Sequence, residues 1–321
     1  MSCLVRLAFG MVCRKTSMQG VVVAVIETSG LTKFYGDAPG IIDLELEVKR
    51  GEVFGFLGPN GAGKSTTIRL LFNFLMPSRG SASILGLDMV KDSVEIRRRT
   101  GYLPGDLALY GHMTAREVLI YFSNLRRLDT TRQVAKLAER FELDLDRKIK
   151  DYSTGNRQKV GLVNAFMHEP ELLILDEPTS GLDPLMQQEF YALVEETRDE
   201  GRTVFLSSHI LPEVERLADR VGIVREQRLI TVDTIDSFRT RSRATITIAF
   251  VERPSASTFR NIPSVLEVDD SGDPDSLVLT VEGPVDLVLK EAAKYKTTTI
   301  TTDTGDLEDV FLSYYAGTNA S

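Results

Sequence analysis

The chain has 321 residues, more than one average domain. Its hydrophobic content of 42% is ordinary for a globular protein. Its net charge of -8 argues against a large nucleic-acid-binding surface, so we expect no nucleic-acid partner. The only two cysteines, Cys3 and Cys13, indicate neither a disulfide framework nor a cysteine metal site.

At the N-terminus, residues 1–21 carry Arg6, Arg14 and Lys15 around a short apolar stretch that only faintly resembles a secretion signal. We expect a disordered leader here, with Met18 as an alternative start. No segment of the chain reaches the roughly 18 to 20 apolar residues that a membrane span needs.

The first folded elements are predicted to be strands over 41–48, where apolar and polar residues alternate, and over 53–57. A glycine-rich loop then leads into a helix predicted over 65–75. The loop fits the pattern G-x-x-x-x-G-K-[ST] and consists of Gly58, Pro59, Asn60, Gly61, Ala62, Gly63, Lys64, Ser65 and Thr66.

Each fixed residue of this loop has a physical task. Glycines let the backbone turn its N–H groups toward an anion at a helix N-terminus. Lys64 is expected to reach the β- and γ-phosphates of a nucleoside triphosphate, and the Ser65 hydroxyl to bind the accompanying Mg²⁺. Strand, loop and helix in this order predict a nucleotide-binding site.

After the loop, strands and helices alternate, which predicts an α/β core with a parallel sheet. Residues 91–165 show helical apolar periodicity and predict a helical subdomain. A continuous apolar run at 172–175 predicts a central strand covered on both faces. The remaining elements of this part are predicted as helices over 114–125, 134–141, 186–199 and 213–218 and a strand over 203–206.

Two carboxylates follow the apolar run, at the strand end where α/β sheets bind ligands. Asp176 is suited to hold Mg²⁺ through its hydration shell, and Glu177 to orient and deprotonate an attacking water. A solvated acidic turn would have the same sequence. Only a fold that joins this strand end to the phosphate loop makes Lys64 and Asp176 partners.

Composition changes near residue 240, which predicts a second, small α+β domain of ferredoxin-like order. A last short helix is predicted over 307–315. The other elements of this domain are predicted as strands over 244–251, 265–269, 277–282 and 297–302 and a helix over 285–295.

The ordered set of motifs resembles the nucleotide-binding subunit of an ABC (ATP-binding cassette) transporter, over residues 28 to 225. The resemblance implies a P-loop NTPase core of ABC type with a helical subdomain, and ATP and Mg²⁺ as its cofactors. The segments that carry it, besides the phosphate loop, are the opening strand 31–36, the signature segment 152–160, the second carboxylate motif 176–183 and the histidine switch 207–209.

The resemblance also implies roles for single residues. Tyr35 would stack on adenine, and His209 would contact the γ-phosphate and help to position the water held by Glu177. Asp183 would lie at the seam between two subunits. The signature residues, which would bind ATP held by the partner subunit, are Ser153, Thr154, Gly155 and Asn156. A lone chain is therefore expected to be a half-site that works as a dimer.

Two positions depart from the family pattern. Thr154 adds a Cβ where the signature usually has glycine, so contact with a γ-phosphate is expected to be looser or reshaped. Gly105, after Pro104, stands where the family usually has a glutamine that senses Mg²⁺ and water. Our hypothesis is that Asp106 partly substitutes for that glutamine.

The C-terminal extension and the ending 305–312 resemble the branch that exports drugs, antibiotics, lipids or polysaccharides through a separate membrane permease. That branch implies a location on the cytoplasmic face of the cell membrane, bound peripherally. The alternatives are an importer subunit fed by a solute-binding protein, or a soluble member that acts on ribosomes or DNA. The C-terminal domain could also be purely a dimerisation module under any of these.

The expected domain organisation follows from these assignments. It consists of a leader over 1–21, an ATP-binding domain over 22–239, an accessory domain over 240–316 and a tail over 317–321.

Overall fold

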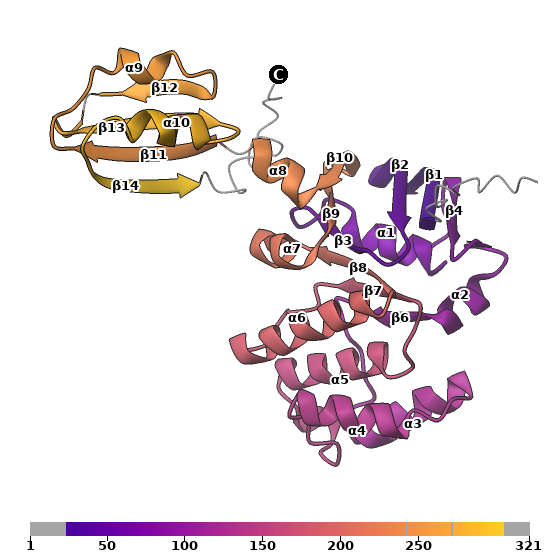
Figure 1. The fold of residues 1–321 in the computed structure, drawn as a ribbon. Coiled ribbons are helices and arrows are strands. Elements are labelled where there is room, and N and C mark those ends of the chain that lie inside the picture. The colour runs from indigo at the N-terminus through magenta and orange to yellow at the C-terminus, as the bar shows by residue number, and fades with distance from the viewer. Residues whose placement is uncertain (1–23, 242, 271, 305–321) are drawn as a thin grey trace, which may run out of the picture.

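The computed structural model describes residues 24–241, 243–270 and 272–304. The predicted leader over 1–21, the predicted helix over 307–315 and the tail over 317–321 lie outside these residues. Within them the chain forms three sheets with helices packed between and around them (Figure 1).

The first sheet is antiparallel and has the order β2-β1-β4-β5. In β2 the residues that point to the core, such as Leu44, Leu46 and Val48, alternate with exposed acids, as the sequence predicts for this strand. The strands of this sheet are β1 (Ala24–Tyr35), β2 (Ala38–Lys49), β4 (Arg79–Ile84) and β5 (Leu87–Asp88).

The central sheet has the order β10-β9-β3-β8-β7-β6 and is parallel except at β10. Its middle strands are fully buried, which explains their continuous apolar runs. The strands are β3 (Val53–Leu57), β6 (Thr100–Leu103), β7 (Leu172–Asp176), β8 (Thr203–Ser208), β9 (Arg220–Arg225) and β10 (Arg228–Thr234). Because β3, β8 and β7 are neighbours, the loops that follow them meet at one edge of the sheet.

Helices cover the central sheet, and α3, α4 and α5 gather beyond its β6 end (Figure 1). Helix α3 begins with a capping box, in which Thr114 accepts from the Glu117 backbone N–H and the Glu117 side chain accepts from the Thr114 backbone N–H. The helices are α1 (Lys64–Leu71), α2 (Ser93–Arg99), α3 (Ala115–Arg126), α4 (Thr131–Arg140), the 3-10 turn η1 (Ile149–Asp151), α5 (Thr154–Phe166), α6 (Pro184–Asp199), α7 (Leu211–Leu217) and α8 (Ile235–Arg241).

Three details differ from the sequence prediction. Helix α1 ends at Leu71, four residues before the predicted end, because Asn73 adopts a left-handed backbone with φ of 52°. The predicted helical stretch 91–165 contains a sheet strand, β6, in which Gly101 packs directly on the Ala165 carbonyl of α5. The β9–β10 hairpin was not predicted at all.

Residues 243–304 form a separate unit with the order β12-β13-β11-β14, antiparallel throughout. The sheet order is that of the predicted ferredoxin-like arrangement. Of its two helices only the second was predicted, and α9 lies where the sequence suggested a polar segment. Its elements are β11 (Arg243–Phe250), α9 (Ser257–Arg260), β12 (Val265–Asp269), β13 (Ser276–Glu282), α10 (Asp286–Ala292) and β14 (Thr297–Thr304).

The cores also divide. Phe250 and Phe259 pack together, with ring centroids 6.0 Å apart, in a cluster made only of residues from the C-terminal unit. Two other clusters lie on the two faces of the central sheet. This division supports the proposal that the accessory domain is a folding unit of its own. In the part of the chain that the structure describes, no helix has the length and apolarity to cross a membrane.

We predict that Phe259→Ala destabilises the C-terminal unit by about 3 to 5 kcal/mol, because the ring is fully buried and its removal leaves a cavity. Hydrogen exchange should show lower protection in β11 to β14 and unchanged protection in β3, β7 and β8. A parallel loss of protection in the central sheet would show that the two parts fold as one unit.

Candidate functional site

The loops after β3, β7 and β8 enclose a cleft of about 480 Å³. Of the residues predicted to bind ATP, the cleft is lined by Tyr35, Asn60, Gly61, Gly63, Lys64, Ser65 and Thr66. The other three do not line the cleft: Gly58 and Ala62 are buried, and Pro59 is exposed. Asp176, Glu177 and His209 complete the opposite wall.

The phosphate loop depends on close backbone packing. Gly63 has a φ of 108°, and a Cβ there would lie 2.5 Å from the Gly40 carbonyl oxygen. Gly58 is equally confined, since its Cβ would lie 2.4 Å from the Val224 carbonyl oxygen. Only glycine fits at these two places. The loop is therefore held against β2 on one side and β9 on the other.

Lys64 is 6% exposed and begins α1. Its Nζ donates to the carbonyl oxygens of Gly58, at 2.7 Å, and Pro59, at 3.3 Å. These bonds fix the ammonium group above the mouth of the loop, where it can meet a phosphate.

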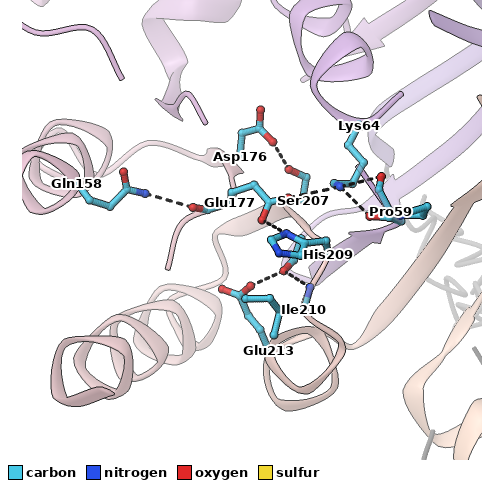
Figure 2. A network of polar contacts seen from close by, with 11 residues as sticks. Pro59, Lys64, Gln158, Asp176, Glu177, Ser207, His209, Ile210 and Glu213 are labelled. Carbon is cyan, nitrogen blue, oxygen red and sulfur yellow. Dashed lines mark hydrogen bonds and ion pairs between the residues drawn. The ribbon is translucent and has the colours of Figure 1, made fainter. Parts of the chain in front are cut away.

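The Glu177 carboxylate is the meeting point of three strand ends (Figure 2). Lys64 Nζ lies 3.4 Å from Glu177 Oε1, and His209 Nδ1 donates to Glu177 Oε2 over 2.6 Å. Because an ionised carboxylate only accepts, Nδ1 must carry the hydrogen, and Nε2 could donate to a phosphate only if it were protonated as well. The structure thus brings together Lys64, Glu177 and His209, which the sequence separates widely.

Glu177 itself has a left-handed backbone, with φ of 51°. Its N–H donates to the Ser207 carbonyl over 3.0 Å, which anchors it to β8. A non-glycine residue in this conformation costs about 1 to 3 kcal/mol, and such residues concentrate at functional sites. The turn aims the side chain back over the cleft.

Asp176 is 4% exposed and accepts a hydrogen bond from the Ser207 hydroxyl. Gly105 approaches it closely, because a Cβ at Gly105 would lie 3.1 Å from Asp176 Oδ2. A larger residue there would press on the carboxylate. Asp106, the next residue, lines the same cleft.

Two positioning contacts were missed by the sequence analysis. The Gln158 amide, on α5, donates to the carbonyl oxygens of Glu177, at 3.2 Å, and Pro178, at 3.0 Å. The Ser208 hydroxyl donates to Glu213 Oε2 over 2.5 Å. Burial, and to a smaller extent the charge of Glu177, raise the pKa of the Glu213 carboxyl. The sequence signal of this second contact was weak: Glu213 stands five residues after the end of β8.

Tyr35 stands at the rim of the cleft and is 47% exposed. Its ring lies against Gly40, where a Cβ would come within 2.8 Å of the ring carbon Cε2, and its hydroxyl lies 3.4 Å from Thr66 Oγ1. The Lys33 ammonium lies over the ring, 5.7 Å from its centroid. The stacking of Tyr35 on adenine stays a prediction.

The signature residues Ser153, Thr154, Gly155 and Asn156 do not line the cleft of their own chain. Ser153 caps α5, its hydroxyl accepting from the Asn156 backbone N–H over 3.2 Å. Gly155 packs against the Gly181 carbonyl, and Thr154 is exposed. The segment is therefore a helix N-terminus that faces outward, as the prediction of a contact with a second subunit requires.

Asp183 is exposed and also lies outside the cleft. It caps α6 by accepting from the backbone N–H groups of Leu185, at 3.1 Å, and Met186, at 3.0 Å. The predicted seam residue therefore has a structural role in its own chain.

The donor set fits Mg²⁺ bound together with phosphates. In the described ranges no three acids, histidines or cysteines cluster as a complete metal site. Ser65 and Asp176 instead supply one hydroxyl and one carboxylate, and Mg²⁺ commonly takes its remaining oxygens from water and substrate phosphates. The cleft also contains three acids, Asp106, Asp176 and Glu177. Because their negative charges would repel a triphosphate without a cation, a bound Mg²⁺ suits this site.

Comparison with known proteins agrees with this geometry. The family model for "ABC transporter" matches residues 41–180. The chain is 38% identical over 222 residues to the bacitracin transport ATP-binding protein BcrA of Bacillus licheniformis, covering 68% of this chain and 72% of BcrA. It is 39% identical over 219 residues to the daunorubicin resistance ATP-binding protein DrrA3 of Streptomyces coeruleorubidus, covering 67% of this chain and 69% of DrrA3.

Among solved structures, an ATP-binding subunit of an ABC transporter superposes with a TM-score of 0.64 at 34% identity. The match covers 67% of this chain and 92% of that one. The fold predicted from the sequence, a P-loop NTPase core of ABC type, is confirmed.

We predict that Asp106→Ala raises the Mg²⁺ concentration needed for half-maximal ATP hydrolysis about fivefold, because the cleft loses an acceptor for metal-bound water. Titration of the ATPase rate with Mg²⁺ checks this, with Asp199→Ala, an exposed acid at the end of α6, as the control. An unchanged Mg²⁺ dependence would show that Asp106 does not substitute for the missing glutamine.

Proposed function

The chain belongs to the ATP-binding proteins of ABC transporters, a family of ATPases coupled to transport, and we propose that it powers export of an antibiotic-, drug- or lipid-like compound. The permease is a separate membrane subunit, and this chain binds to it on the cytoplasmic face of the cell membrane. The similarity to BcrA, a bacitracin transport protein, and to DrrA3, a daunorubicin resistance protein, supports the export direction.

One observation carries the catalytic part of the proposal: Lys64 and His209 converge on the two oxygens of Glu177. In our scheme Lys64 binds the terminal phosphate oxygens, and Glu177 accepts a proton from the attacking water. His209 orients the Glu177 carboxylate. Ser65 and Asp176 hold Mg²⁺, which, when bound, neutralises charge on the phosphates.

The second part of the proposal concerns a partner cassette. The outward-facing N-terminus of α5, with Ser153 and Gly155, would bind the γ-phosphate of ATP held by a second copy. Asp183 would then lie near the seam. Closure around two ATP molecules and reopening after hydrolysis would drive the permease through its cycle.

We propose that the permease binds three exposed apolar residues, Phe74, Met76 and Val94, which we call the apolar patch. These side chains are 50%, 59% and 73% exposed. The Phe74 ring packs on Tyr102 of β6, with centroids 5.7 Å apart, and the Arg97 guanidinium of α2 lies over it. Strand β6 leads directly to Asp106 in the cleft, so a partner bound here would lie close to the nucleotide.

We predict that Glu177→Gln lowers ATP turnover by about 10²- to 10⁴-fold and leaves ATP affinity within a few-fold, because it removes a base and keeps the shape. Lys64→Ala should weaken ATP binding at least about tenfold, through loss of a charge-assisted contact. Single-turnover hydrolysis and equilibrium binding check the two. Steady-state hydrolysis retained in both variants would contradict these roles.

We predict that Val94→Asp weakens recovery of the chain with its permease from detergent-solubilised membranes at least about tenfold, because a charge enters an apolar contact. ATP affinity should not change. Val251→Asp is the matched control, since Val251 is 56% exposed and lies in the C-terminal unit. Equal recovery of both variants would exclude the patch as the docking surface.

A further inference from the structure

The β9–β10 hairpin contacts the phosphate loop at Gly58 and Gly61. Strand β9 is the parallel neighbour of β3 (Figure 1). The residue pairs run from Phe54↔Arg220 to Leu57↔Ile223. The next residue of β9, Val224, has its carbonyl against Gly58, the first residue of the loop. The hairpin therefore continues beside the loop where β3 stops.

The turn of this hairpin has an unfavourable backbone for its residues. Arg225 pairs with Arg228, so Glu226 and Gln227 form a two-residue turn. Both have left-handed backbones, with φ of 49° and 59°. Such turns favour Asn-Gly, because glycine adopts positive φ without steric cost. A Gln at the second position needs a compensating interaction.

Gln227 makes two contacts that could compensate. Its side-chain Nε2 donates to the Gly61 carbonyl oxygen over 2.9 Å, and its own carbonyl accepts from the Ile42 N–H of β2 over 2.7 Å. Glu226, by contrast, is exposed and pairs only with the neighbouring Arg225 among the contacts found for it. The side chain at position 227 thus reaches the loop, and the one at 226 does not.

The peptide that carries the Gly61 carbonyl is held by two hydrogen bonds. Gly61 has a φ of 81°, and a Cβ there would meet no described atom within 4 Å, so packing at its Cα does not restrain it. The Gln227 amide binds the carbonyl oxygen, and the Ala62 N–H of the same peptide donates to the Pro59 carbonyl oxygen over 3.2 Å. If this peptide rotated, its carbonyl oxygen would turn toward a bound phosphate and repel it.

We propose that Gln227 is a positioning residue for nucleotide binding: its amide holds the Gly61 carbonyl away from the phosphates and so pre-organises the loop. This rests on the proposed function, since it assigns a task to the same ATP site. Gln227 touches neither Glu177 nor His209, so its effect falls on ATP binding rather than on the chemical step.

The test is Gln227→Gly, which is compatible with the left-handed turn and removes the side chain together with its amide. We expect the Kd for ATP to rise about fivefold to tenfold, the loss of one hydrogen bond. The KM for ATP should rise in parallel, and kcat at saturating ATP should change less than about twofold. The unfolding temperature should be unchanged or higher, because glycine relieves the backbone strain.

Two further variants separate positioning from stability. Glu226→Gly relieves the same strain one residue earlier and should leave the Kd for ATP unchanged. Gln227→Glu keeps the shape but has no donor, so it should weaken ATP binding at least as much as Gln227→Gly.

The outcomes for this inference and for the proposed function are distinguishable. If the wild-type chain binds ATP and Gln227→Gly binds it equally tightly, the role of Gln227 is wrong and the proposed function stands. If Gln227→Gly and Glu226→Gly weaken binding equally, the effect comes from the backbone of the turn and not from the Gln227 amide, which also overturns the inference. Failure of the wild-type chain to bind ATP would overturn the proposed function and the inference with it.

Discussion

The Glu177 carboxylate is held from two sides, by the Lys64 ammonium on Oε1 and the His209 imidazole on Oε2. These three side chains meet because β3, β8 and β7 are parallel neighbours, so the residues that follow the three strands lie at one edge of the sheet. The strained backbone at Glu177 is tolerated because β8 anchors it through the Ser207 carbonyl. The proposed hydrolysis of ATP depends on the meeting of Lys64, Glu177 and His209 at this edge of the central sheet.

Much of this site could be predicted from the sequence because its residues stand in strong local patterns. Lys64 belongs to a glycine-rich loop with a fixed spacing, and Glu177 follows an uninterrupted apolar run. His209 was weaker evidence alone and gained force from its place in the ordered set of motifs that resembles the family. The structure confirms that these three side chains meet, whereas their catalytic roles stay predictions.

The sequence could not predict contacts between elements that carry no recognisable motif or hydrophobic periodicity. Strand β6 is only four residues long and contains Gly101, so it does not show the alternation or apolar run of a strand. Gln158 and Gln227 are ordinary polar residues, and only the fold brings their amides to the Glu177 and Gly61 carbonyls. The close approach of Gly105 to Asp176 likewise depends on the tertiary structure.

The two hydrogen bonds from Gln158 have a mechanical consequence. They fasten α5, the helix whose first turn carries the signature residues, to the peptide groups of Glu177 and Pro178. If the layer of helices α3, α4 and α5 tilts relative to the central sheet, either both hydrogen bonds break or the turn at Glu177 moves with the layer. The Glu177 carboxylate, the proposed general base, is thus mechanically coupled to the helical layer. A force on that layer could change the orientation of the carboxylate without any contact with the nucleotide.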